Sequence, residues 1–369
     1  MTTSPAPTLR SHRSGFTLVE LLVVIVIIVI LVGLLIPALS GARTSARKAA
    51  TRSTMQSFLA ACDAFRTDKQ RAPGAIPVDF LGLAENEAKI QAAGFGITPM
   101  QSAILDLAGG FVGRGTNIQI IASDSSREVL FPGNNNRFVI DVFKIGNVDG
   151  PQYLKLNKES FPLVEGHVND GDRFKNEGAY TAITNLPNLA GRSLLSFIPT
   201  MVDGEGNPVL LWQQDALAAD DAEFAALRTT TATNTQPGTT PRPKFAWASN
   251  SGVLAADAIG RNPRDQLAQS YIGGGSATSA SDEDKIASAL QAVLGNPSFS
   301  IKRTPPGGGT PVAYPSKAKG DLILHAAGPD GVFLQKKNAS NASRVVYAAE
   351  EGASDQHTFE EFDDFVEAR

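Results

Sequence analysis

The hydrophobic pattern of the chain changes character twice near its start. Residues 21–39 read LLVVIVIIVILVGLLIPAL without a charged residue, which meets the length criterion for a membrane-spanning helix. From residue 38 to 69 the pattern becomes amphipathic, because apolar side chains recur at the helical spacings of three and four. Together the two patterns predict one helix of about 75 Å at 1.5 Å per residue. The apolar stripe of its second half comprises Met55, Phe58, Leu59, Cys62 and Phe65.

Pro37 lies inside this predicted helix. Proline lacks an amide N–H and its ring crowds the preceding turn, so we expect it to kink or locally melt the helix. Gly33 and Gly41 lie four residues to either side and would ease the distortion. The sequence therefore predicts a helix that bends or loosens at Pro37.

Beyond the helix, short periodic segments alternate with segments rich in Gly and Pro. The exit itself, residues 71–77, contains two prolines and a glycine, which end a helix. Helical periodicity predicts helices at residues 84–93, 100–107, 215–227 and 282–294. Ile, Val and Phe enrichment predicts strands at residues 117–122 and 138–145, and 153–156 is a further candidate strand.

Composition narrows the classes of function. The net charge is −4 and only 19% of residues are charged, so we expect no nucleic-acid partner. The single cysteine, Cys62, excludes an internal disulfide framework and is expected to be a packed thiol. Apart from His12, the histidines are His167, His325 and His357, which lack the spacing of metal ligands. Without an HExxH, GxSxG or phosphate-binding glycine motif, we expect no enzymatic activity.

Glu20 is the one acid at the edge of the apolar run. A carboxylate in lipid is costly, so such a residue is a functional hypothesis that needs a named partner. Cleavage after Gly15 would create that partner, the free amino group of Phe16. An ordinary secretory signal is cut after its apolar region, whereas this cut precedes it, so the helix would stay in the mature protein.

The junction RSGFTLVE, with Glu20 and the aliphatic run after it, resembles the prepilin N-terminus of the type IV pilin and type II secretion pseudopilin superfamily. The resemblance implies that a prepilin peptidase cuts after Gly15 and N-methylates Phe16. It also implies that Glu20 neutralises the N-terminal amine of a neighbouring subunit during assembly. The implied parts are a leader at 1–15, a transmembrane half-helix at 16–37, an amphipathic half-helix at 38–69 and a head domain at 70–369.

Three later motifs extend the resemblance into the head domain. The first is the turn Gly206-Asn207-Pro208, which precedes an expected buried strand and has Glu205 where the family usually has tryptophan. The second is Gly-Pro-Asp-Gly at 328–331, and the third is the closing segment 362–366. The resemblance implies an α+β fold, with the long helix packed on a small antiparallel sheet that carries insertions.

Resemblance to the major pseudopilins also implies a calcium ion between the last two motifs. Asp330, Asp363 and Asp364 are the candidate ligands by position, and calcium takes six to eight oxygens from such groups. The cations Lys336 and Arg344 in the intervening loop argue against the ion. The alternative is a turn that binds no ion.

The resemblance favours a filament-forming pseudopilin subunit of a type II secretion-like system. The implied partners are prepilin peptidase, copies of the chain and related pilins, an inner-membrane assembly platform and lipid. The chain would cross the bacterial inner membrane once, with its head outside the cytoplasm, and then enter a periplasmic or extracellular filament. The alternatives are a minor or adhesive type IV pilin, and an exported binding protein or enzyme that uses the helix as a tether. The tether alternative predicts that Glu20 is dispensable.

Overall fold

The computed structural model divides the chain into two compact units, residues 1–46 and 47–369, and each is described by itself. The predicted helix at 84–93 and the predicted strand at 117–122 lie outside the described residues. The structure describes residues 17–74, 76, 81, 97–115, 126–130, 137–141, 144–146, 152–163, 198–220, 222–226, 242–254, 270–273, 280–304, 311–336, 344–349 and 356–369.

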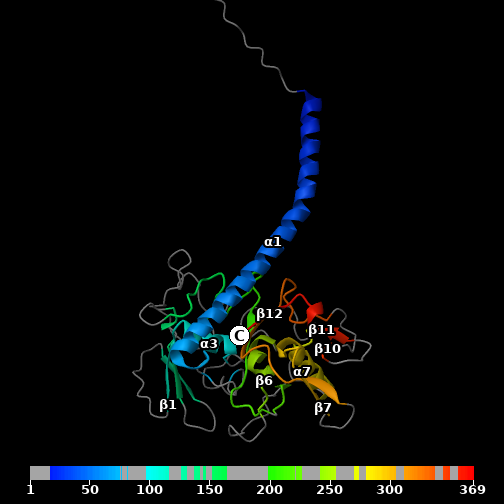
Figure 1. The fold of residues 1–369 in the computed structure, drawn as a ribbon. Coiled ribbons are helices and arrows are strands. Elements are labelled where there is room, and N and C mark those ends of the chain that lie inside the picture. The colour runs from blue at the N-terminus through cyan, green and yellow to red at the C-terminus, as the bar shows by residue number, and fades with distance from the viewer. Residues whose placement is uncertain are drawn as a thin grey trace, which may run out of the picture. The chain divides into compact units, whose positions relative to one another are not determined.

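The predicted long helix is confirmed. Helix α1 runs without interruption from Leu18 to Lys69 and is drawn in blue in Figure 1. Its helical assignment continues through Pro37, so the helix is not broken there, and a change of helix direction at this residue stays a prediction. By length and composition α1 can span a membrane, with a mean hydropathy of 3.5 over its most apolar window and no part of that window buried.

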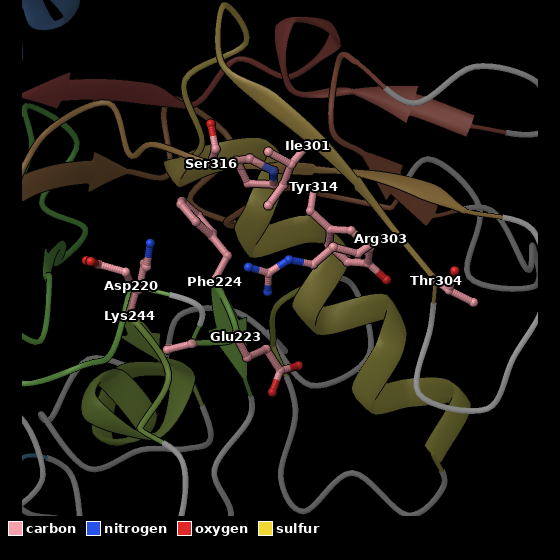
Figure 2. A pocket seen from close by; sticks show the side chains of 11 residues that line it. Asp220, Glu223, Phe224, Lys244, Ile301, Arg303, Thr304, Tyr314 and Ser316 are labelled. Carbon is pink, nitrogen blue, oxygen red and sulfur yellow. The ribbon is translucent and has the colours of Figure 1, made fainter.

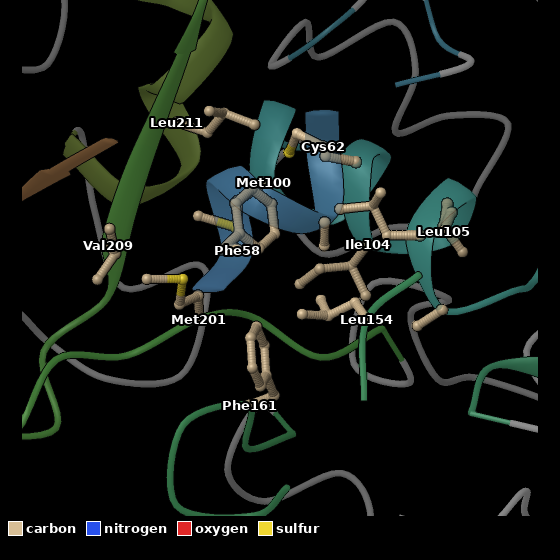
Figure 3. Close-up of a cluster of buried hydrophobic side chains, with 14 of the residues drawn as sticks. Phe58, Cys62, Met100, Ile104, Leu105, Leu154, Phe161, Met201, Val209 and Leu211 are labelled. Carbon is tan, nitrogen blue, oxygen red and sulfur yellow. The ribbon is translucent and has the colours of Figure 1, made fainter. Parts of the chain in front are cut away.

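The amphipathic half of α1 supplies one side of the first hydrophobic core. All five residues of its predicted apolar stripe are at most 2% exposed. They pack with Met100 and Ile104 of helix α3 (Pro99–Leu107) and with Val209 and Leu211 (Figure 3). Burial raises the pKa of the Cys62 thiol to about 12, as expected for a packed rather than a reactive thiol.

Helix α3 starts at Pro99, one residue before the predicted start. Thr98 and Gln101 form a capping box, in which each side chain bonds the backbone N–H of the other residue. Pro99 occupies the first turn, where a missing N–H costs nothing. The helix predicted at 100–107 is therefore confirmed.

A three-stranded antiparallel sheet forms the centre of the head's hydrogen-bonded structure. In order across the sheet its strands are β12 (Phe365–Ala368), β9 (Leu322–Ala326) and β4 (Val209–Gln213). The register pairs Ala326 of the central strand with Val209 on one side and Phe365 on the other. The small antiparallel sheet expected of the head is therefore present.

Both faces of this sheet are covered. Along β4, Val209 and Leu211 join the first core, whereas Leu210 and Trp212 join a second core on the opposite face. Helix α7 (Ala280–Leu294) contributes Leu290 to the second core, which confirms the helix predicted at 282–294. Because both faces are packed, the central strand reads as a continuous apolar run broken only by a histidine.

The remaining described elements are short. A second sheet has the order β1 (Phe111–Gly115), β3 (Arg137–Asp141), β2 (Ser126–Leu130). Three strand pairs complete the list: β5 (Ala225–Ala226) with β6 (Phe245–Ala246), β7 (Ser300–Arg303) with β8 (Val312–Pro315), and β10 (Arg344–Val346) with β11 (Gln356–Thr358). The short helices are η4 (Trp247–Asn250), α5 (Ser251–Leu254) and η6 (Phe359–Glu361).

Two sequence predictions are wrong. The helix expected at 215–227 is absent, because Asp215 starts a turn in which its Oδ1 accepts a hydrogen bond from Leu217 N at 2.9 Å. The strand expected at 153–156 is absent, because the amides of Tyr153 and Leu154 both donate to the carbonyl of Leu107 at the end of α3. The strand expected at 138–145 is shorter, since β3 ends at Asp141.

Candidate functional site

The described part of the prepilin junction begins at Thr17, so Gly15 and Phe16 lie outside it. Glu20 lies in the first turn of α1, and its Oε2 accepts hydrogen bonds from Thr17 N at 2.9 Å and Thr17 Oγ1 at 2.8 Å. Glu20 N in turn donates to Thr17 Oγ1 at 3.2 Å. This reciprocal pair is a capping box, which satisfies two N–H groups that the helix start leaves without a partner.

Glu20 therefore has a role within its own chain that the sequence analysis missed. The signal was present, since Thr17 and Glu20 have the T-x-x-E spacing of a capping box directly before an apolar run. A carboxylate is also favoured at a helix N-terminus by the helix dipole. The acid is thus held at one orientation in the isolated chain.

The apolar half of α1 is exposed within its unit. From Leu18 to Ile36 each large apolar side chain is at least 46% exposed. Contiguous apolar surface of this extent is typical of membrane or protein contacts. The surface is therefore suited to lipid, to the same helix of another subunit, or to each in turn.

In the second unit, the Gly206-Asn207-Pro208 motif forms the predicted turn. The Oδ1 of Asp203 accepts hydrogen bonds from Glu205 N and Asn207 N at 2.9 and 2.8 Å, and Gly206 has a φ of +85°. That backbone conformation is strained for residues with a Cβ, which explains the glycine. Burial raises the pKa of Asp203.

The turn is docked on α1. Gly204 N donates to Thr51 Oγ1 at 2.9 Å, and a Cβ on Gly204 would lie 2.8 Å from the Arg47 carbonyl oxygen. Glu205 forms an ion pair with Arg47. Glu205, which stands where the resembling motif usually has tryptophan, thus also contacts the helix.

The Gly-Pro-Asp-Gly motif lies against both other head motifs. A Cβ on Gly328 would lie 2.5 Å from the Asp363 carbonyl oxygen, and one on Gly331 would lie 2.9 Å from Asn207 Oδ1. Asn207 Nδ2 also donates to the Gly328 carbonyl at 3.4 Å. Three segments that are far apart in sequence therefore meet in one place.

The three candidate calcium ligands do not share one environment. Asp364 Oδ2 lies 2.6 Å from His325 Nε2 and also accepts from Leu334 N at 3.0 Å, and the side chains of Asp364 and His325 are fully buried. Burial raises the pKa of Asp364. Because both of its oxygens accept hydrogen bonds inside the protein, Asp364 does not fit the predicted ligand set.

Asp330 and Asp363 remain as candidate ligands. Asp330 Oδ1 accepts from Val332 N at 2.9 Å. Burial, together with the negative charges of Asp363 and Asp364, raises the pKa of Asp330 to about 6. Within the part of the chain that the structure describes, no three His, Cys, Asp or Glu side chains are grouped as a metal site. Calcium at this loop stays a prediction.

Comparison with known proteins agrees with the N-terminal geometry. Residues 10–36 match the model of the prokaryotic N-terminal methylation motif. Together with the long apolar helix, this match supports a prepilin-type protein, and that helix is consistent with a membrane anchor of the pilin type. The motif implies processing by prepilin peptidase and assembly with other pilin-type subunits. No curated protein and no solved structure shows significant similarity to the chain.

Proposed function

We propose that the chain is a filament-forming pseudopilin subunit of a type II secretion-like system, without catalytic activity of its own. The observation that carries the proposal is the packing of the three head motifs. The turn at Asn207, the loop at Gly328 and the closing segment at Asp363 contact one another, and the turn bonds α1 through Gly204. The head is in this way joined to the part of α1 that lies in its own unit, from Arg47 onward, so it would be carried with that helix into a filament.

Assembly would exploit the geometry at Glu20. Both hydrogen bonds that Thr17 donates go to Oε2 of Glu20, so we expect Oε1 to accept the Phe16 amine of a neighbouring subunit. Two charges in a low-dielectric surrounding are costly unless they are paired. The pair would therefore set the axial offset between neighbouring helices, while the exposed apolar surfaces of those helices pack together.

The subunit would be inserted in the bacterial inner membrane with residues 1–15 in the cytoplasm and the head outside. Leader removal is the first step that can be tested. Gly15→Leu is expected to retain the leader, because the peptidase must accept the residue before the cut. Intact-mass and N-terminal peptide analysis of protein from its native membrane should show wild-type chains beginning at methylated Phe16 and variant chains beginning near Met1. A Gly15→Leu chain that still began at Phe16 would contradict cleavage at this junction.

Calcium binding is a second proposal for the head, with Asp330 and Asp363 as its carboxylate ligands. Near pH 7.5 Asp330 is mostly ionised, because its pKa is about 6. Calcium that binds only the folded head stabilises it by mass action, by about 2.7 kcal/mol at a hundred times its Kd. A melting curve with calcium should therefore lie several degrees above one with EGTA, and Asp330→Asn should remove the difference. If the wild-type melting curves with calcium and with EGTA coincide, calcium does not bind at this loop.

A further inference from the structure

A pocket of about 390 Å³ lies against the β7–β8 hairpin (Figure 2). The hairpin lines it with Ile301, Arg303 and Tyr314, and the segments that lead into β5 and β6 line it with Phe224 and Lys244. Its volume is within the range of ligand-binding pockets. The pocket contains none of the prepilin, head-motif or calcium-candidate residues.

The charges around the pocket disfavour a simple ion as its ligand. The pocket is lined by two acids, Asp220 and Glu223, and by two cations, Lys244 and Arg303. The formal charges of the lining therefore cancel. The side chains of Phe224, Ile301 and Tyr314 also line the pocket, and they suit an apolar group of a ligand.

Among the described residues, no strand pairs with the outer edge of β7. Ser300 and Lys302 are exposed, and β8 is the only strand that β7 pairs with among the described residues. Ser316 N donates to the Phe299 carbonyl at 3.1 Å, so Phe299 and Ser316 are a hydrogen-bonded pair of the antiparallel ladder. Because such pairs alternate along an antiparallel ladder, the backbone groups of Ser300 and Lys302 point away from β8. An exposed edge of this kind is a template for an added strand.

The hairpin has apolar and cationic surface at that edge. Phe299 and Ile301 are 42% and 36% exposed, and they lie on the same face of the hairpin because they are two residues apart. Lys302 and Arg303 lie in β7, and Lys317 Nζ lies 4.3 Å from the centre of the Phe299 ring. Residues 300–304 and 311–317, the described hairpin and its ends, contain no acid.

We propose that the hairpin binds an extended peptide segment of a partner protein, in which acidic residues flank an apolar one. The segment pairs with the outward backbone groups of Ser300 and Lys302. Its apolar side chain enters the pocket against Phe224 and Tyr314, and its carboxylates meet the exposed lysines of the hairpin, Lys302 and Lys317. Main-chain pairing supplies affinity and the pocket supplies specificity, as in other strand additions. The inference does not depend on filament assembly.

The test uses the full-length protein in detergent micelles and a fluorescein-labelled peptide, Gly-Thr-Asp-Phe-Asp-Thr-Gly. A matched peptide has lysine in place of both aspartates. Fluorescence anisotropy should show the acidic peptide binding about tenfold or more tightly than the lysine peptide, a difference of about 1.4 kcal/mol. Equal affinities would overturn the proposal.

Lys302→Pro is the decisive variant. It removes the outward N–H while leaving the residues bonded to β8 unchanged, and proline is tolerated on an edge strand with its nitrogen toward solvent. Lys302→Pro should lower the affinity for the acidic peptide by about tenfold. Lys302→Ala should lower it by less than about threefold, as expected for the loss of one exposed charge. Peptide affinity of Lys302→Pro equal to wild type, with an unchanged melting curve, would overturn strand addition. Self-association through the hairpin that excludes the peptide would also overturn it, because the occupant would then be a second copy.

Discussion

Glu20→Ala is expected to leave the protein in the membrane and to abolish its incorporation into filaments. The apolar run that directs insertion is unchanged, whereas the amine of a neighbouring Phe16 loses its counter-charge. Breaking a buried ion pair by removing one partner costs about 3–5 kcal/mol. That cost corresponds to a loss of roughly two to three and a half orders of magnitude in the assembly equilibrium, since each 1.4 kcal/mol is tenfold. Membrane fractionation and sheared-filament assays measure the two steps separately.

Two control variants separate charge pairing from helix capping. Glu20→Gln keeps an acceptor that can complete the capping box with Thr17 but has no charge, so it should fail to assemble as Glu20→Ala does. Thr17→Ala keeps the charge and removes the cap, which costs about 1 kcal/mol of helix stability, so it should still assemble. Normal filaments from Glu20→Gln would mean that capping, and not the charge pair, is what assembly requires. Normal filaments from Glu20→Ala would contradict the charge-pair mechanism and favour the alternative in which the helix is only a membrane tether.

Asp364→Ala is expected to destabilise the head more than any exposed substitution. It leaves His325 Nε2 and Leu334 N without their hydrogen-bond partner in a fully buried position. The expected loss is about 3–5 kcal/mol, or roughly 10 °C in melting temperature for a domain of this size. Both tryptophans, Trp212 and Trp247, lie in the second core, so intrinsic fluorescence reports its unfolding directly.

The matched control is a second His–carboxylate pair in the described part of the head. His357 Nδ1 lies 2.8 Å from Glu361 Oε2, but these side chains are 30% and 45% exposed. Glu361→Ala should therefore cost no more than about 1 kcal/mol, as exposed pairs do. If the Asp364→Ala and Glu361→Ala variants had the same melting temperature, the buried pair would not be a determinant of head stability.

The sequence by itself determined the N-terminal helix and the class of the protein. The apolar run, the stripe from Met55 to Phe65 and the T-x-x-E box are all patterns between residues that are close in sequence, and helix formation depends on such local spacing. The same holds for helix α3, whose start is set by Thr98 and Gln101. The turn at Gly206 was predictable for the same reason, because it needs only a residue that accepts positive φ.

Only the tertiary structure decided how the head motifs combine. His325 and Asp364 meet because β9 and β12 pair in one register, and no local pattern encodes that register. The candidate calcium set changed for this reason, since the pairing turned Asp364 inward to His325. The segment from Asp215 has helical periodicity, yet two features take its backbone out of a helix. One is the local turn in which Leu217 N donates to Asp215 Oδ1, and the other is the pairing of β5 with the distant strand β6. Local preferences of about 1 kcal/mol or less per residue yield to such contacts.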